Sequence, residues 1–325
     1  MKSSALVELA AKRDTELSAW RASTQYAWAW NLHSVSEELD GKEPDYRPRF
    51  RAAHVLANAA RQDEPAECLR KCADIVRLGQ DGAAGGGLVP LAIGGNMTRR
   101  AAMSAAICAR KATVNELRVA ALEFRRLVAN PVSPSQAYAL NALVLATAAQ
   151  RTATLADSSS SLFQRFLNSP ERRNAAAAID VFLDSLPTWQ TLEPARYPEG
   201  LASVRATHQA WRDSGNAIVR VSASGDTLTD IMLNELSAQA MLRLTVIELE
   251  VLIARKQTGE LHDAPPVLDE PALRDPFSGA PFHWAPCGQK ICIRTFGPDG
   301  RDDSGWTTGD DIFWDCDRRE PSSPD

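Results

Sequence analysis

Five aspartates near the C-terminus are the residues whose types and spacing best predict chemistry. They lie within thirteen residues of one another: Asp299, Asp302, Asp303, Asp310 and Asp311. Carboxylates forced together repel one another unless they are protonated or bound to a cation. Oxygen ligands on a flexible loop suit Ca²⁺, which takes about six to eight oxygens. The segment therefore predicts a structural calcium site, and the alternative is a solvated acidic loop without a metal.

Two short β-prone segments flank this acidic loop. Ile291, Ile293 and Phe296 belong to a run that ends at Gly297, and the run 312–314 follows the loop. Apolar, β-prone runs bounded by Pro, Asp and Gly are typical of strands joined by a turn. We therefore expect two paired antiparallel strands with the acidic loop between them. The loop is not an EF-hand, because the glycine that an EF-hand needs at its sixth position is replaced by Ser304.

The last part of the chain resembles the C-terminal end of the major pseudopilins of type II secretion. Three segments carry the resemblance: the turn DPFSGAPF (275–282), the strand end FGPDG (296–300) and the acidic pair before isoleucine, GDDI (309–312). The resemblance implies a Ca²⁺ ion held by Asp299, by Asp302 or Asp303, and by Asp310 and Asp311. It covers about forty of the 325 residues, and the hydrophobic assembly helix of that family is absent from the N-terminal part of this chain. It therefore implies a module like that of the pseudopilins and raises a link to secretion, but it does not imply pilus assembly.

Six cysteines divide into an N-terminal and a C-terminal group. Cys287, Cys292 and Cys316 lie in and beside the two expected strands, and we expect one disulfide there, Cys292–Cys316 or Cys287–Cys292. In the N-terminal group, Cys68 and Cys72 share a helix face, and we expect Cys108 to be a small buried hydrophobic residue. No CxxC pair occurs, and none of these cysteines has a histidine at the short spacing typical of zinc sites.

The composition limits the class of protein and its location. With a net charge of −5 and a pI of about 5.7, the chain lacks the basic character of general nucleic-acid binding proteins. It contains no run of eighteen apolar residues, so we expect no transmembrane segment, and residues 1–20 lack the apolar core of a signal peptide. Either the protein is cytosolic, or an N-terminal anchor or signal has been removed from this chain. The disulfide and the resemblance favour a periplasmic or other extracytoplasmic location.

Helical periodicity dominates the chain before the acidic module. We expect helices over 4–40, 48–79 (one or two helices), 98–129, 133–155, 170–187, 198–215 and 226–258. The predicted fold is mainly α: a helical body over residues 1–258, built as a multi-helix bundle or an array of helical hairpins, then a linker and β-module over 259–325. In the last helix, Glu235 and Gln239 interrupt the apolar stripe, and we interpret them as a locally solvated stretch.

Catalytic motifs are missing from the sequence. It contains no HExxH, no GxSxG and no P-loop, and its five histidines form no recognisable constellation. We therefore expect a non-enzymatic envelope scaffold or a protein that binds a protein partner, with a structural calcium site. The alternative is a hydrolase with a pocket among the helices. A convergent polar cluster in a pocket would favour the hydrolase, and a broad apolar patch would favour the scaffold.

Overall fold

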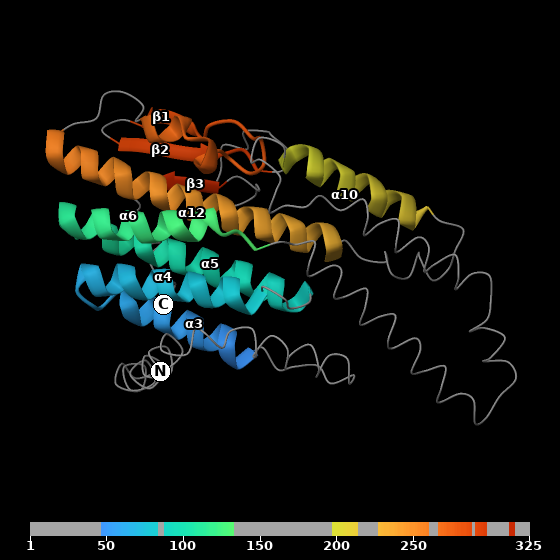
Figure 1. Ribbon diagram of the computed structural model, residues 1–325, viewed down its shortest axis with the longest axis horizontal. Helices are drawn as coiled ribbons and strands as arrows, with labels where there is room; N and C mark the ends of the chain where they lie inside the picture. Colours follow the sequence, from blue (N-terminus) through green and yellow to red (C-terminus); the bar gives the residue numbers. More distant parts are fainter. Residues whose placement is uncertain are drawn as a thin grey trace, which may run out of the picture.

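The protein is mainly α-helical, with a small antiparallel β-module at its C-terminal end, as predicted (Figure 1). The computed structural model describes residues 47–83, 88–132, 197–213, 227–259, 266–287, 290–297 and 312–315. The expected helices over 4–40, 133–155 and 170–187 lie outside the described residues. The helices are α3 (Arg47–Ala60), α4 (Pro65–Ala83), α5 (Leu88–Ala109), α6 (Val114–Ala129), α10 (Tyr197–Arg212) and α12 (Thr227–Thr258).

The 32-residue helix α12 is the element on which the others assemble. It packs against α5, α6, α10 and the β-module, so almost every residue between Ile231 and Ile253 is buried. Leu236, Leu244 and Ile247 are among its fully buried side chains. The helix begins at Thr227 and ends before Gly259, which has a φ of +89°, a conformation that glycine adopts without strain. Both ends agree with the prediction.

Helices α4 and α5 cross at a pair of glycines. We expected Gly79 to end a helix, but α4 continues to Ala83. Gly79 instead allows close approach of the backbone of α5: a Cβ atom on Gly94 would lie 2.4 Å from the carbonyl oxygen of Gly79. The two helices therefore need these glycines to reach their packing distance.

The segment predicted as one helix over 98–129 is two helices. Helix α5 ends at Ala109, and α6 starts after Thr113 with a capping box. The Thr113 hydroxyl accepts from the Glu116 backbone amide, and the Glu116 carboxylate accepts from the Thr113 amide at 2.7 Å. These bonds satisfy donors that a helix start leaves unpaired, so the chain turns here.

The β-module is a three-stranded antiparallel sheet in the order β1-β2-β3. Strands β2 (Lys290–Thr295) and β3 (Ile312–Asp315) correspond to the two predicted runs and pair as expected, whereas β1 (His283–Cys287) was not predicted. Two short 3₁₀ helices, η3 (Pro266–Asp269) and η4 (Pro271–Leu273), connect the module to α12 and contact it. Apolar side chains of the module, including Leu273, Phe277 and Phe282, pack into the same core as the helices.

Candidate functional site

The five predicted calcium ligands, Asp299, Asp302, Asp303, Asp310 and Asp311, lie outside the described residues. The sheet nevertheless brings the two ends of their segment together, because Thr295 at the end of β2 pairs with Ile312 at the start of β3. Within the described ranges, no group of three or more His, Cys, Asp or Glu side chains could hold a metal ion. The calcium site therefore stays a prediction about the loop between β2 and β3.

The C-terminal cysteines are placed only in part. Cys287 pairs with Lys290 across β1 and β2, and Cys292 lies between Ala285 and Asp315, its partners on the two neighbouring strands. The two cysteines are thus on adjacent strands but are not directly opposite each other. Cys316 follows β3 and lies outside the described residues, so the disulfide expected in this module stays a prediction.

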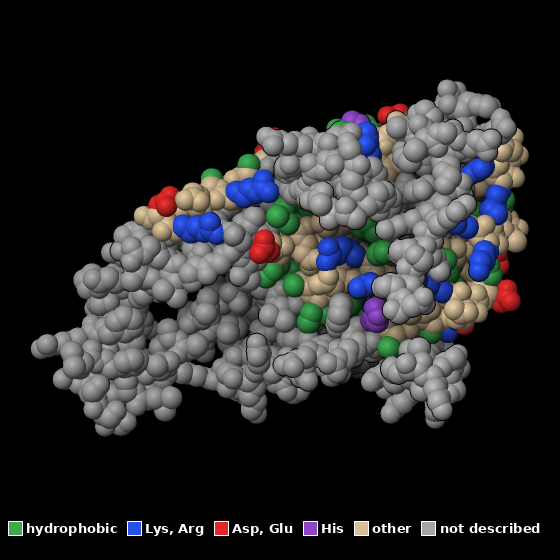
Figure 2. Space-filling model, turned by 180° about the vertical axis from the view of Figure 1, so that it is seen from behind, with side chains coloured by type: hydrophobic (Ala, Val, Ile, Leu, Met, Phe, Trp, Pro, Cys, Tyr) green, Lys and Arg blue, Asp and Glu red, His purple; other side chains and the backbone are tan. Residues whose placement is uncertain are grey.

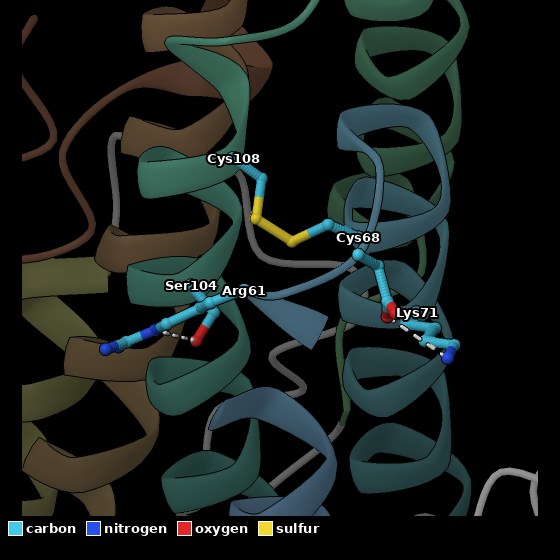
Figure 3. Close-up of a disulfide and its surroundings, with 6 residues drawn as sticks. Arg61, Cys68, Lys71, Ser104 and Cys108 are labelled. Carbon is cyan, nitrogen blue, oxygen red and sulfur yellow. Dashed lines mark hydrogen bonds and ion pairs between the residues drawn. A yellow bond between two sulfur atoms is a disulfide. The ribbon is translucent and has the colours of Figure 1, made fainter. Parts of the chain in front are cut away.

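A disulfide joins α4 to α5 instead of leaving Cys108 alone (Figure 3). Cys68 and Cys108 are 40 residues apart, and their Cα atoms are 6.2 Å apart, within the range that disulfides span. The prediction that Cys108 is an unpaired hydrophobic residue was therefore wrong, although it is buried as expected. Cys72, one turn after Cys68, is a buried free thiol, and burial raises its pKa to about 12, which makes it unreactive.

The DPFSGAPF segment folds into a turn around the buried carboxylate of Asp275. This carboxylate accepts hydrogen bonds from the Phe277 amide at 3.0 Å, from the Ser278 hydroxyl at 2.7 Å and from the Thr295 hydroxyl at 2.8 Å. The Asp275 amide donates to the Ala280 carbonyl at 2.9 Å, which closes the turn. Asp275 thus connects the turn to the end of β2, immediately before the predicted calcium loop.

A ladder of polar side chains runs along one face of α12 towards this turn. Glu235, Gln239 and Arg243 follow one another at four-residue intervals and are 6%, 7% and 3% exposed. The Gln239 amide donates to the Glu235 carboxylate at 3.3 Å, and an Arg243 guanidinium nitrogen donates to the Gln239 carbonyl oxygen at 3.3 Å. Another guanidinium nitrogen donates to the backbone carbonyl of Arg274 at 2.6 Å. The ladder therefore links the helical core to the residue that precedes Asp275.

The burial of this ladder corrects the interpretation of Glu235 and Gln239 as a solvated stretch. Their side chains point into a bundle whose α4 and α5 come close at Gly79 and Gly94, and both glycines line the same cavity as the ladder. The spacing Glu235, Gln239, Arg243 was a signal that sequence reasoning missed, because side chains four residues apart on a helix can bond one another.

The cavity beside the ladder has a volume of about 20 Å³. It is lined by α4, α5, α6 and α12, with Gln80, Thr98 and the three ladder residues as polar groups. A volume of this order holds roughly one water molecule. The polar cluster that would favour an enzyme is present, but the cavity is too small for an organic substrate.

Glu235 has the most informative ionisation in this cluster. Burial raises the pKa of its carboxyl from 4.5 to about 7, and the hydrogen bond from Gln239 offsets only part of this effect. The carboxyl therefore changes charge near neutral pH, which is the range in which a buried acid can transfer a proton or alter local packing.

The surface of the described residues carries little exposed apolar area. Val119 and Leu122 on α6 are the large hydrophobic side chains that are well exposed there, and a pair of this size is ordinary for a protein surface. No described helix is long and apolar enough to span a membrane.

Comparisons with known proteins give no relative: the chain matches no protein-family model, no curated protein sequence and no solved structure.

Proposed function

We propose that this protein is a non-enzymatic scaffold or partner-binding protein of the cell envelope, in an extracytoplasmic compartment. The observation that carries the proposal is the buried disulfide between Cys68 and Cys108. Structural disulfides persist in oxidising compartments and are rare where thiols are kept reduced. The disulfide fastens α4 to α5 at the level of the core, so its role is to hold the bundle together.

The architecture of the C-terminal module supports the same proposal. The buried turn around Asp275 and the ladder to Arg243 anchor the module to the helical core. The paired ends of the acidic loop suit a structural Ca²⁺ ion held by the loop aspartates, as the resemblance to pseudopilins implies. A module fixed in this way presents a rigid surface to a protein partner, and a function in secretion accords with it.

The test is the thiol state of the protein in its native cell. Cells are fractionated, free thiols are alkylated before any reduction, and the peptides that contain Cys68 and Cys108 are identified by mass spectrometry. We expect the protein in an extracytoplasmic fraction, with these two peptides disulfide-linked and Cys72 alkylated only after unfolding. A cytosolic protein with both cysteines alkylated would contradict the proposal.

A hydrolase is the second candidate, and one observation favours it. Glu235 lines a cavity of the volume of one water molecule and has a pKa of about 7, which suits a general base. Against it stands the small volume of that cavity, which leaves no room for a substrate. Hydrolysis of fluorogenic esters, phosphates or peptides that is lost in Glu235→Gln but retained in Asp230→Asn would favour the enzyme.

A further inference from the structure

Positive charge is concentrated on two neighbouring helices. Helices α3 and α5 pack against each other and contain 14 and 22 residues, with no aspartate or glutamate in either. Their arginines are Arg47, Arg49, Arg51, Arg99 and Arg100. The other packed helices mix both signs, as in α4, which contains Glu67, Arg70, Lys71, Asp74, Arg77 and Asp81. In a chain with a net charge of −5, this segregation calls for a physical reason.

Polar and basic side chains form one stripe on each of the two helices. On the α3 side, His54, Asn58 and Arg61 are spaced by four and three residues, with Arg61 directly after the helix. The His54 ring nitrogen and the Asn58 side-chain amide are 3.1 Å apart. Such spacing places these side chains on one face.

The α5 stripe consists of Asn96, Arg100 and Ser104, which are four residues apart. The two stripes meet where Nε of Arg61 donates to the Ser104 hydroxyl at 3.2 Å (Figure 3). The basic cluster, meaning His54, Arg61, Arg99 and Arg100, therefore spans both helices.

The arginines of this cluster lack carboxylate partners among the described residues. Arg61 donates to the neutral Ser104 hydroxyl, and Arg99 donates to the neutral Asn96 amide oxygen. By contrast, Arg77 and Arg125 elsewhere in the bundle pair with Glu123 and Glu250.

The cluster is close enough for its charges to affect one another. Burial and then the positive charges of Arg100 and Arg61 lower the pKa of His54. Burial and then Arg100 lower the pKa of Arg99. Like charges held together in this way are relieved by a bound anion.

We propose that the basic cluster of α3 and α5 binds a phosphate group, either of a free phosphate compound or of an anionic lipid headgroup. Guanidinium groups donate paired hydrogen bonds to phosphate oxygens. Figure 2 shows Lys and Arg side chains gathered near a histidine on the face opposite to that of Figure 1. Phosphate binding at this site does not require an extracytoplasmic location. A failure of the proposed function would therefore leave this proposal unaffected, and the reverse also holds.

Two experiments test this site. One is calorimetric titration with inorganic pyrophosphate, and the other is flotation with vesicles of phosphatidylcholine with or without phosphatidylglycerol. The variant is Arg99→Gln with Arg100→Gln, and Arg100→Gln alone serves as a milder variant because Arg100 is exposed. The control is Arg118→Gln with Arg255→Gln, which removes the same charge from exposed positions on α6 and α12. Circular dichroism checks that each variant is folded.

We expect binding that weakens with salt, about tenfold weaker in the double variant and unchanged in the control. The NMR titration of His54 should give a higher pKa with pyrophosphate present, because the bound anion favours the imidazolium. Binding of pyrophosphate assigns a free phosphate compound, and binding of the anionic vesicles alone assigns a lipid headgroup. Three results would overturn the proposal: no binding of either probe, an equal loss of binding in the control variant, or tighter binding of a single-stranded oligonucleotide than of either probe.

Discussion

The hydroxyl of Thr295 donates a 2.8 Å hydrogen bond to the carboxylate of Asp275, twenty residues earlier in the chain, and both side chains are buried. The same hydroxyl accepts from the Gly297 amide at 3.2 Å. One buried contact thus joins the turn that follows η4 to the end of β2. Strand β2 leads directly into the predicted calcium loop, and β3, which follows that loop, contacts α12.

Thr295→Val should destabilise the protein more than Ser278→Ala. Both hydroxyls donate to the Asp275 carboxylate, but Thr295 is fully buried, whereas Ser278 is exposed and water can replace it. We expect a loss of about 2 kcal/mol in the free energy of unfolding for Thr295→Val and below about 1 kcal/mol for Ser278→Ala. Urea denaturation measures both losses. Equal losses would show that burial does not strengthen the contribution of the Thr295 hydrogen bond to the free energy of unfolding.

Glu235 should make the protein less stable as the pH rises. Its folded pKa of about 7 is above its ordinary value of 4.5, so the unfolded chain releases the proton first. The stabilising contribution of the protonated carboxyl is fully present below pH 4.5 and is lost as the pH rises to about 7. This loss lowers the free energy of unfolding by on the order of 3 kcal/mol.

Glu235→Gln should remove this pH dependence and be more stable than the wild type at pH 8, since the amide cannot ionise. Asp230→Asn on the exposed start of α12 is the control and should keep the wild-type dependence. Unfolding free energies between pH 4.5 and 8 measure the effect. The same slope in Glu235→Gln and wild type would contradict the burial of this carboxyl.

Loss of the disulfide should loosen the bundle. The crosslink encloses a sequence separation of 40 residues, and a loop of this length is worth about 4 kcal/mol in the chain-entropy treatment. Cys68→Ala with Cys108→Ala should therefore melt well below the wild type and lose most of its response to a reductant. Cys72→Ala leaves the disulfide in place and should retain that response, and an equal response in both variants would mean that the sensitivity lies elsewhere.

Gly94→Ala should disturb the crossing of α4 and α5. The added methyl group would lie 2.4 Å from the carbonyl oxygen of Gly79 and 3.1 Å from the Ala83 side chain, so the backbones must move apart. We expect a destabilisation of about 2 kcal/mol, measured by thermal unfolding. Ala106→Gly is the comparison, because it also changes α5 but introduces no clash; its cost should be the intrinsic helix penalty of about 1 kcal/mol plus roughly 0.8 kcal/mol for the lost buried methyl group. A Gly94→Ala variant as stable as the wild type would contradict the close crossing.

The predicted calcium loop should respond to Ca²⁺ and not to Mg²⁺. Binding to the folded state alone stabilises it by about 2.7 kcal/mol when free Ca²⁺ is a hundred times Kd, and Mg²⁺ suits such a flexible site poorly. Thermal midpoints in Ca²⁺, Mg²⁺ and EDTA measure this for the wild type, Asp299→Ala and Asp310→Ala. The rise in Ca²⁺ should vanish in both variants, and identical melting of the wild type in Ca²⁺ and EDTA would leave only a solvated acidic loop.

Local signals in the sequence were enough for the fold class and for several boundaries. Thr227 and Gly259 delimit α12, and the β-prone runs became β2 and β3, because backbone preferences and periodicity act over a few residues. The signal for the break before α6 was also local, because Thr113 and Glu116 form a capping box. The helical pattern that extends on both sides of it nevertheless led to the prediction of a single helix.

The tertiary structure decided which residues meet and which are buried. Cys68 pairs with Cys108 because α4 and α5 pack side by side. Asp275 bonds Thr295 because the end of β2 lies against the turn that contains Asp275. The spacing of Glu235, Gln239 and Arg243 is visible in the sequence, but the same spacing occurs on solvated helices. The packing of α5 and α6 against α12, with α4 lining the same cavity, buries these side chains, and this burial raises the pKa of Glu235.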